Sequence, residues 1–417
     1  MSKRKARPDW WCKEYEEGKV ERKEWSDLMK PMNMDELLEA VRSVQAGKAA
    51  GPDRLSADML KYLFWGRRES EVGQPNVTRP GPPDAKWNFE DTPDPNAAMR
   101  VVLLLCNASI GLAVVTPGMQ KGEIVYLPKP SEGGYTVDVE EMRPITLLPE
   151  LGKLTNRVLA RRMTQTLMQH PDLLEGAQRG FLKDGSIGQC INAVLDVFED
   201  HHERKGKRKA LFAVSYDLRK AYDCVQEYSL RAALTRAGTP PAFVEYVCSS
   251  LKSARSQVRT KHGLTKGFDL KTSVRQGDPL APLLFILLAD MLHKGLRENP
   301  LFGGVNDGYK FSTQQDLVVS STGYADDFMI FSETSVGIER MHAWVREFCG
   351  AHEMEINAKK TVFLATGCDD AQIPILVNVS GDEPIEPHDE EHFFKYLGVW
   401  IRVQRGKDAW SKQLKVS

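Results

Sequence analysis

Two aspartates capable of metal or acid–base chemistry stand side by side, Asp326 and Asp327, in the stretch GYADDFMIF (residues 323–331). A third, Asp217, ends the apolar stretch FAVSYD. Two carboxylates about 4 Å apart repel each other by roughly 4 kcal/mol at an effective dielectric constant of about 20, so one stays protonated unless a cation intervenes. Mg²⁺ binds one or two carboxylates plus substrate phosphates, and two such ions about 4 Å apart activate a hydroxyl and stabilise a leaving pyrophosphate. If Asp217 lies beside the pair, the three residues predict nucleotidyl transfer.

The segments around these aspartates predict a sheet that brings them together. The run FMIF (328–331) is continuously apolar, which predicts an interior strand, and DLVVSST (316–322) is strand-like. Asp326 and Asp327 would then lie at a hairpin turn. Because aspartate favours turns for its own reasons, the pair taken alone also fits an ordinary solvated turn. The strand that ends at Asp217 resolves this choice only if it lies next to the hairpin.

Helices are expected around this sheet. The clearest follows RQGDP, where apolar residues from Leu280 to Leu292 recur at helical spacing, with Asp278 as the cap and Pro279 as the first helical residue. Another runs from a cap at Ser335 to Gly350. Further helices are predicted over residues 33–44 with Asn33 as the cap, 56–64, 99–115 as a buried helix, and 148–169. Strands and helices are mixed without strict alternation, so the fold class is α+β.

Charge and composition indicate which partners and which cellular compartment the sequence fits. The 417 residues carry a formal net charge of −1, so a nucleic-acid partner must be held by local basic patches. The seven scattered cysteines and nine histidines form no CxxC or HExxH pair, which predicts reduced thiols and no zinc site. The N-terminus is charged and lacks a signal-peptide core, and the apolar-leaning stretch Val101–Val115 is shorter than the roughly 18–20 residues that span a bilayer. We therefore expect a soluble protein of a reducing compartment, nuclear or cytoplasmic, with no membrane partner.

A series of segments, in order from about residue 46 to residue 402, resembles the reverse transcriptases of non-LTR (LINE-like) retrotransposons, with those of group II introns as the next relatives. VSYDLRKAYDCV, SVRQGDPLAPLLFILLAD and GYADDFMIF resemble motifs A, B and C of that family. AGKAAGPDRLSADMLK, IVYLPKP and MRPITLLPELGKLTNRVLARRM resemble its fingers segments, and AQRGFLKDGS resembles the turn that contacts the template. HEMEINAKKT resembles motif D and FKYLGVWI resembles motif E, the primer grip. Each match is weak alone, but their shared order is specific.

The resemblance implies an RNA-directed DNA polymerase with the right-hand polymerase fold. The implied organisation is an N-terminal extension (1–32), N-terminal fingers helices (33–65), a flexible Pro/Gly-rich insertion (66–97), fingers (98–210), palm (211–402) and a truncated start of a thumb or a tail (403–417). The chain stops at Ser417, soon after FKYLGVWI, so we expect the thumb to be missing or truncated and the binding of primer–template to be weak and poorly processive.

The resemblance also assigns roles at the active site. Asp217 and Asp326 match the metal-binding aspartates, Asp327 matches the third carboxylate, and the backbone carbonyl of Leu218 would be a further ligand of two Mg²⁺ ions, or of Mn²⁺ in their place. Lys360 matches a lysine that acts as the general acid toward pyrophosphate, although Lys359 beside it is an alternative. The residues implied in nucleotide binding are Tyr222 as the steric gate that excludes a 2′-hydroxyl, Gln276 and Gly277 against the incoming nucleotide, and Lys129 and Arg143 on the triphosphate.

Contacts with template RNA and DNA primer are implied at three places. The residues are Arg157 and Arg161 on a helix, Arg179, Gly180 and Lys183 in the template turn, and Tyr396, Leu397 and Gly398 in the primer grip. The basic run ERKGKRK (203–209) fits a solvated loop slightly better than a nucleic-acid contact. The implied partners are template RNA, a DNA primer, dNTPs, and proteins that supply the missing thumb or an endonuclease.

Two other functions remain open from the sequence. An RNA-dependent RNA polymerase of the same palm class is disfavoured by Tyr222, because such an enzyme must admit the 2′-hydroxyl. A domesticated or truncated reverse-transcriptase fold could instead serve as a nucleic-acid-binding or structural subunit without activity. The intact Asp217, Asp326 and Asp327 argue against that second alternative, and the early end of the motif series argues for it.

Overall fold

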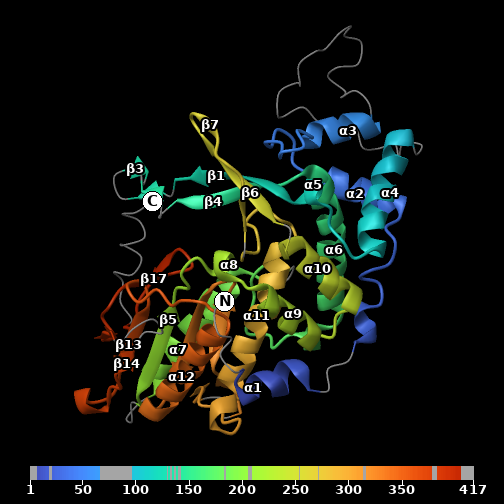
Figure 1. The fold of residues 1–417 in the computed structure, drawn as a ribbon. Coiled ribbons are helices and arrows are strands. Elements are labelled where there is room, and N and C mark those ends of the chain that lie inside the picture. Colours follow the sequence, from blue (N-terminus) through green and yellow to red (C-terminus); the bar gives the residue numbers. More distant parts are fainter. Residues whose placement is uncertain are drawn as a thin grey trace. The chain divides into compact units, whose positions relative to one another are not determined.

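Helices and strands are intermixed along the chain, which confirms the α+β class (Figure 1). The computed structural model describes residues 7–17, 21–65, 96–128, 130–131, 134–135, 138–139, 142–182, 185–204, 209–252, 254–270, 272–312, 316–377 and 383–404. The chain divides into two units, each built from separate stretches of sequence. Unit 1 comprises Met1–Lys19, Leu167–Ala237 and Pro282–Ser417, and unit 2 comprises Val20–Thr166 and Gly238–Ala281.

Unit 1 is organised around a five-stranded sheet. Its strand order is β11 (Ser321–Tyr324), β12 (Asp327–Ser332), β5 (Leu211–Tyr216), β13 (Val362–Thr366) and β16 (Pro387–His388). Strand β5 is buried along its whole length, and β12 lies between β11 and β5. The prediction that FMIF forms an interior strand is therefore confirmed.

Helices cover this sheet. Helix α7 (Ile187–Glu203) packs against β11, whereas α12 (Ser335–Ala351) packs against β12 and β5. On the face that α7 covers, one core cluster joins α7, β5, β12 and β13 to the hairpin of β17 (Phe394–Tyr396) and β18 (Val399–Ile401). Alternate residues of β5 serve the two faces, since Leu211 and Ala213 belong to this cluster while Tyr216 stacks on Phe328 and hydrogen-bonds to His342 of α12.

The tryptophan-rich N-terminal segment is part of the core of unit 1. Helix α1 (Asp9–Trp11) and the helical turn after it bury Trp10, Trp11 and Tyr15. The ring of Trp10 meets the edge of Trp344 on α12 at 4.9 Å, and the Tyr15 hydroxyl lies 3.1 Å from Nε2 of His352. The remaining α-helices and strands described in this unit are α8 (Ala221–Cys224), α9 (Glu227–Arg236), β9 (Tyr309–Lys310), β10 (Val318–Val319), β14 (Leu376–Val377), β15 (Pro384–Ile385) and most of α11 (Ala281–Arg297).

Unit 2 combines a second sheet with a helical core. The sheet order is β4 (Arg143–Leu147), β1 (Lys121–Leu127), β6 (Arg255–Thr260) and β7 (Gly263–Leu264), and β8 (Phe268–Asp269) also pairs with β6. The hydrophobic core joins α2 (Met34–Arg42), α3 (Ala57–Trp65), α4 (Ala97–Gly111) and α6 (Glu150–Gln169). Helices α5 (Pro117–Gln120) and α10 (Pro241–Lys252) and the short pair β2 (Pro130–Ser131) and β3 (Gly134–Tyr135) complete the described elements.

Helix starts show where local signals were sufficient. Asn33 caps α2 in a capping box with Glu36, which confirms that prediction. The expected start of α11 at Pro279 is wrong, because the helix begins at Ala281. The carboxylate of Asp278 instead accepts hydrogen bonds from the Leu280 N–H and from Nδ2 of Asn156. The cap of α12 is Thr334, whose hydroxyl accepts the Gly337 N–H, so Ser335 is the first helical residue.

The helix expected to be buried at 99–115 is buried on one side only. Its inner face contributes Met99, Val102 and Cys106 to the core of unit 2. Leu104 and Leu112 are 68% and 73% exposed. Apolar composition alone therefore overestimated how much of α4 is covered.

Several predictions concern residues outside the described ranges. They are the insertion at 66–95, the tail at 405–417, most of the basic run at 205–208, and the individual residues Lys129 and Lys183. Within the described ranges, none of the helices combines the length and the apolar character that crossing a bilayer requires.

Candidate active site

Strand register brings the three aspartates to one edge of the unit 1 sheet. Strands β5 and β12 are antiparallel with Phe328 opposite Tyr216, so the next positions along them are Asp327 and Asp217. Strands β11 and β12 pair Tyr324 with Asp327, which leaves Ala325 and Asp326 as a two-residue hairpin turn. The predicted placement of Asp217 beside the hairpin is therefore confirmed.

These carboxylates affect one another electrostatically. Burial, followed by the neighbouring charges of Asp326 and Asp217, raises the pKa of Asp327 to about 7, and the ammonium of Lys360 opposes that rise. A carboxyl with such a pKa is half protonated near neutral pH, which relieves the repulsion. A divalent cation would relieve the same repulsion without a proton.

The described residues contain no group of three or more His, Cys, Asp or Glu side chains that could by itself hold a metal ion. Mg²⁺ usually takes one or two carboxylates and completes its shell with water and substrate phosphates, so the adjacent Asp217 and Asp327 of this acidic edge are enough for it. The acidic edge therefore fits a cation that arrives with a phosphate-bearing substrate.

The hairpin turn is held by a buried glutamine that the sequence analysis missed. Oε1 of Gln178 accepts the N–H groups of Ala325 (2.8 Å) and Gly180 (2.9 Å), and its Nε2 donates to the carbonyl of Ala325 (2.9 Å). Ala325 has a φ of +59°, a left-handed conformation that is unfavourable for a residue with a Cβ. Gln178 thus compensates for strain in the turn that carries Asp326.

The segment expected to contact the template lies against the same hairpin. The Arg179 N–H donates to the carbonyl of Gly323 at 2.8 Å, and the Gly323 N–H donates to the carbonyl of Ala177 at 3.0 Å. A Cβ at Gly180 would lie 2.5 Å from the Ala325 nitrogen, so only glycine permits this approach. The side chain of Arg179 is exposed, as a phosphate contact requires. Its partner in the prediction, Lys183, lies outside the described residues.

Asp217 is held by the segment that resembles motif D. The Arg219 N–H donates to the carbonyl of Glu355, and Leu218 forms an isolated bridge with Ile356. Asn357 then contacts Asp217 twice, with its backbone N–H on the Asp217 carbonyl (2.8 Å) and its Nδ2 on the Asp217 carboxylate (2.9 Å). Asn357 is the second residue of the site that the sequence analysis did not single out.

Tyr222 lies close to the carboxylates and is fixed in orientation. Its ring stacks on Phe285 of α11 at 4.7 Å with planes 16° apart. Burial and the charge of Asp326 raise the pKa of its phenol. The hydroxyl is buried without a hydrogen-bond partner among the described residues. A rigid ring beside the acidic edge is what a steric gate requires.

Unit 2 gathers a second set of the predicted residues around strand β4. Arg143 is the first residue of β4 and is exposed. Farther along the strand, the Thr146 N–H donates to the carbonyl of Gln276 at 2.8 Å. Gly277 has a φ of +118°, and a Cβ there would lie 2.5 Å from the Thr146 carbonyl oxygen. The motif B pair and the strand of Arg143 are therefore neighbours within this unit, and Lys129 lies outside the described residues.

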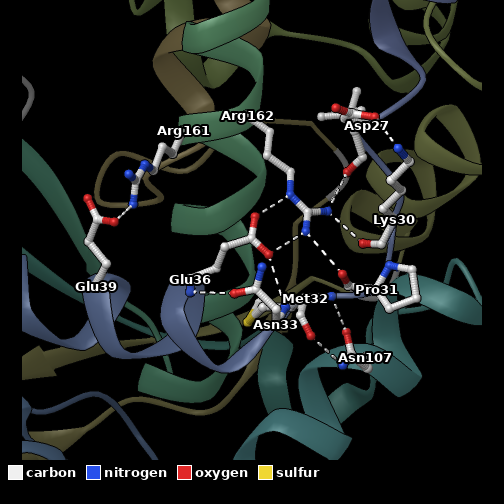
Figure 2. Close-up of polar contacts among 11 residues, drawn as sticks. Asp27, Lys30, Pro31, Met32, Asn33, Glu36, Glu39, Asn107, Arg161 and Arg162 are labelled. Carbon is white, nitrogen blue, oxygen red and sulfur yellow. Dashed lines mark hydrogen bonds and ion pairs between the residues drawn. The ribbon is translucent and has the colours of Figure 1, made fainter. Parts of the chain in front are cut away.

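The helical arginines expected to contact nucleic acid are engaged in ion pairs within unit 2. Arg157 pairs with the buried Glu150 at 2.6 Å, and Arg161 pairs with Glu39. Figure 2 shows the neighbouring Arg162, whose guanidinium binds Glu36 and backbone carbonyls including that of Pro31. These carboxylates neutralise the charge that a phosphate contact would use, so Arg157 and Arg161 are weaker candidates than their basic character indicates.

The hairpin expected to grip the primer is present as β17–β18. Its turn residues Leu397 and Gly398 have φ values of +49° and +86°, typical of a tight two-residue hairpin. The ring of Tyr396 is buried, and its hydroxyl donates to the carbonyl of Thr322 at 3.5 Å. Contact with a primer at this hairpin would therefore fall to the turn and not to the tyrosine ring.

Comparisons with known proteins identify the family of the chain. Residues 127–401 match the family described as "Reverse transcriptase (RNA-dependent DNA polymerase)". The chain is 31% identical over 225 residues to a "Retrovirus-related Pol polyprotein from type-1 retrotransposable element R2" of Popillia japonica, covering 54% of this chain and 29% of that protein. It is 22% identical over 387 residues to a "Probable RNA-directed DNA polymerase from transposon BS" of Drosophila melanogaster, covering 89% of this chain and 36% of that protein.

Among solved structures, apo telomerase from Candida tropicalis, truncated from its C-terminal domain, aligns with a TM-score of 0.47 and 15% identity over 72% of this chain and 58% of that one. The chain spans only about a third of the curated relatives it matches, 29% of the Popillia protein and 36% of the BS protein. Because the matched residues 127–401 cover more than half of the chain, this chain belongs to the reverse transcriptase family, with relatives among the non-LTR retrotransposons.

Proposed function

We propose that this chain catalyses RNA-directed DNA synthesis, the transfer of a deoxynucleotide from a dNTP to the 3′-hydroxyl of a primer paired with template RNA. The observation that carries the proposal is the register of β5 and β12, which sets Asp217 beside Asp327 at the tip of the hairpin that bears Asp326. Three carboxylates gathered at one sheet edge repel one another, and divalent cations would relieve that repulsion.

The cationic ligand in this proposal is a pair of Mg²⁺ ions, with Mn²⁺ as a substitute. Reverse transcriptases generally use divalent metal ions. Asp217, Asp326, Asp327 and the carbonyl of Leu218 would hold them, and the raised pKa of Asp327 supports a site that favours added positive charge. When bound, the ions would activate the primer hydroxyl and stabilise the pyrophosphate.

The side chains of unit 1 have separate tasks in this reaction. The bond between the primer O3′ and the α-phosphorus forms as the bond from that phosphorus to pyrophosphate breaks. Lys360 is exposed at the turn after Asn357 and interacts with the charge of Asp327, which supports a role in giving a proton to the leaving pyrophosphate. The ring of Tyr222, braced by Phe285, would exclude a nucleotide with a 2′-hydroxyl.

The residues of unit 2 would bind the nucleotide. Arg143 suits bidentate binding of the triphosphate, with Lys129 as its proposed companion. The turn at Gln276 and Gly277 is hydrogen-bonded to Thr146 of β4. In this proposal it would contact the base of the incoming nucleotide and the template. Template RNA would contact the exposed Arg179 of unit 1 through its phosphates.

Primer extension on an RNA template with Mg²⁺ tests the proposal. Wild type should extend a DNA primer with dNTPs and fail with rNTPs. Asp326→Ala should abolish product, whereas Asp196→Ala, which removes an exposed carboxylate of α7 in the same unit, should extend like wild type. Equal product from wild type and Asp326→Ala would refute the polymerase function and favour a nucleic-acid-binding role without activity. The comparisons do not favour that alternative, since the matching family is described as a polymerase and the BS relative is named a probable RNA-directed DNA polymerase.

A further inference from the structure

We infer that Asn357 is a positioning residue that fixes the carboxylate of Asp217 and ties it to the turn that carries Lys360. This inference rests on the proposed polymerase function and deepens it. It concerns a neutral side chain that binds neither substrate nor metal in the proposed reaction. Its role would be to set the geometry between a metal-binding carboxylate and the proton donor.

Asn357 grips Asp217 at two points. The backbone N–H of Asn357 donates to the Asp217 carbonyl at 2.8 Å, and its side-chain Nδ2 donates to Oδ2 of Asp217 at 2.9 Å. Among the described residues, no other side chain hydrogen-bonds to this carboxylate. Two bonds from one residue fix both the main chain at the end of β5 and the rotation of the carboxylate plane.

The carbonyl of the same residue organises the turn that follows. It accepts hydrogen bonds from the Lys360 N–H (3.0 Å), the Thr361 N–H (3.0 Å) and the Thr361 hydroxyl (3.0 Å). Asn357 therefore makes five hydrogen bonds, two toward Asp217 and three toward the residues 360–361. Displacing Asn357 would move Asp217 and Lys360 relative to each other.

An asparagine is suited to this task for an electrostatic reason. A lysine or arginine at this place would also orient the carboxylate, but its charge would neutralise Asp217 and compete with a divalent cation. The amide donates a hydrogen bond while leaving the full negative charge available. An aspartate of the same size would accept rather than donate and would add to the repulsion at the acidic edge.

The test combines metal binding with steady-state kinetics. Binding of Mn²⁺ is measured with a chain-terminated primer–template and a dNTP present, as the loss of the electron paramagnetic resonance signal of free Mn²⁺ relative to the same mixture without protein. Asn357→Ala should weaken Mn²⁺ binding by about 10- to 100-fold, the usual effect of removing a group that orients a metal ligand. In primer extension it should lower kcat by a larger factor than it raises the KM for dNTP, because the proposed triphosphate-binding side chains lie in unit 2.

Matched variants separate positioning from folding. Asn299→Ala removes another buried amide of unit 1, one that donates to the carbonyl of Arg340, so it should lower the melting temperature without changing Mn²⁺ binding. Thr361→Val removes one bond to the Asn357 carbonyl and keeps both bonds to Asp217, so its effect should be smaller than that of Asn357→Ala. If Asn357→Ala does not fold, Asn357→Asp keeps the side-chain volume and should still lose activity.

The outcomes distinguish this inference from the proposed function. Wild-type extension together with unchanged Mn²⁺ binding and kcat in Asn357→Ala would overturn the inference and leave the polymerase function intact. Full activity in Asn357→Asp would overturn it as well. A wild-type chain that binds Mn²⁺ but extends no primer would refute the polymerase function, while the Mn²⁺ comparison would still decide the role of Asn357.

Discussion

In unit 1 the acidic elements are held by side chains that perform no chemistry, Gln178 on the hairpin turn and Asn357 on the end of β5. In unit 2 the candidate for triphosphate binding, Arg143, stands exposed at the start of β4, and its guanidinium has no hydrogen-bond or ion-pair partner among the described residues. The difference follows from charge. Carboxylates that repel each other must be held together before a ligand arrives, whereas a cation that binds phosphate needs only to be reachable.

The largest difference between the two units is expected in acid. The elements that carry the aspartates of unit 1 pack around buried neutral histidines, so low pH should destabilise that unit. Burial lowers the pKa of His293 and His342 to about 4 and that of His352 to about 3. These folded-state values lie below the unfolded value of about 6.5, so the stability is complete above pH 6.5 and is lost as the pH falls toward 4. Each histidine contributes a slope of about 1.4 kcal/mol per pH unit in that range.

Unit 2 lacks this sensitivity, since its sequence holds one histidine, His262, which is exposed. Amide hydrogen exchange at pH 7 and pH 5 should show protection lost first in α12 and β5 of unit 1, while β1 and β4 of unit 2 stay protected. His262→Gln should leave this pattern unchanged. Equal loss of protection in both units would contradict the contrast.

Removing the Gln178 side chain that holds the turn between β11 and β12 should have the next largest effect. Gln178→Ala deletes three hydrogen bonds and leaves the buried N–H and carbonyl of Ala325 without these partners. This should lower the free energy of unfolding by about 3 kcal/mol. Primer extension should fall by at least about 10-fold, because Asp326 loses its fixed position. Gln257→Ala, which removes a partly buried glutamine whose amide donates to the Thr265 carbonyl, is the control and should preserve activity and most of the stability.

The contrast between the units also explains what the sequence could predict. Apolar runs and helical spacing were sufficient for β5, β12, α2 and α12, because those signals are local. The hydrogen bonds from Gln178 to Ala325 and from Asn357 to Asp217 could not be predicted in this way. Their partners are 147 and 140 residues apart in the sequence. Helix starts failed where a side chain had a distant competing partner, as Asp278 has in Asn156.

A substitution at Arg143 in unit 2 should affect nucleotide binding and not stability. Arg143→Ala removes an exposed cation, so it should leave the free energy of unfolding within about 0.5 kcal/mol of wild type. Loss of a charge-assisted contact to the triphosphate, worth about 1.5–3 kcal/mol, should raise the KM for dNTP by roughly 10- to 100-fold. Steady-state primer extension and chemical denaturation measure the two effects. A destabilised Arg143→Ala variant with normal KM would mean that this arginine belongs to the scaffold.

The smallest effect is expected at the hydroxyl of Tyr222, beside the acidic edge. The hydroxyl of Tyr222 is buried without a hydrogen-bond partner among the described residues, so Tyr222→Phe should change stability by less than about 1 kcal/mol and leave the stack on Phe285 intact. Discrimination between dNTP and rNTP should persist in Tyr222→Phe and collapse in Tyr222→Ala, because the ring and not the hydroxyl fills the space of a 2′-hydroxyl. If Tyr222→Phe loses discrimination, the Tyr222 hydroxyl must gain a hydrogen-bond partner when the nucleotide binds. Tyr222 would then resemble Arg143, whose proposed partner is also supplied by the nucleotide.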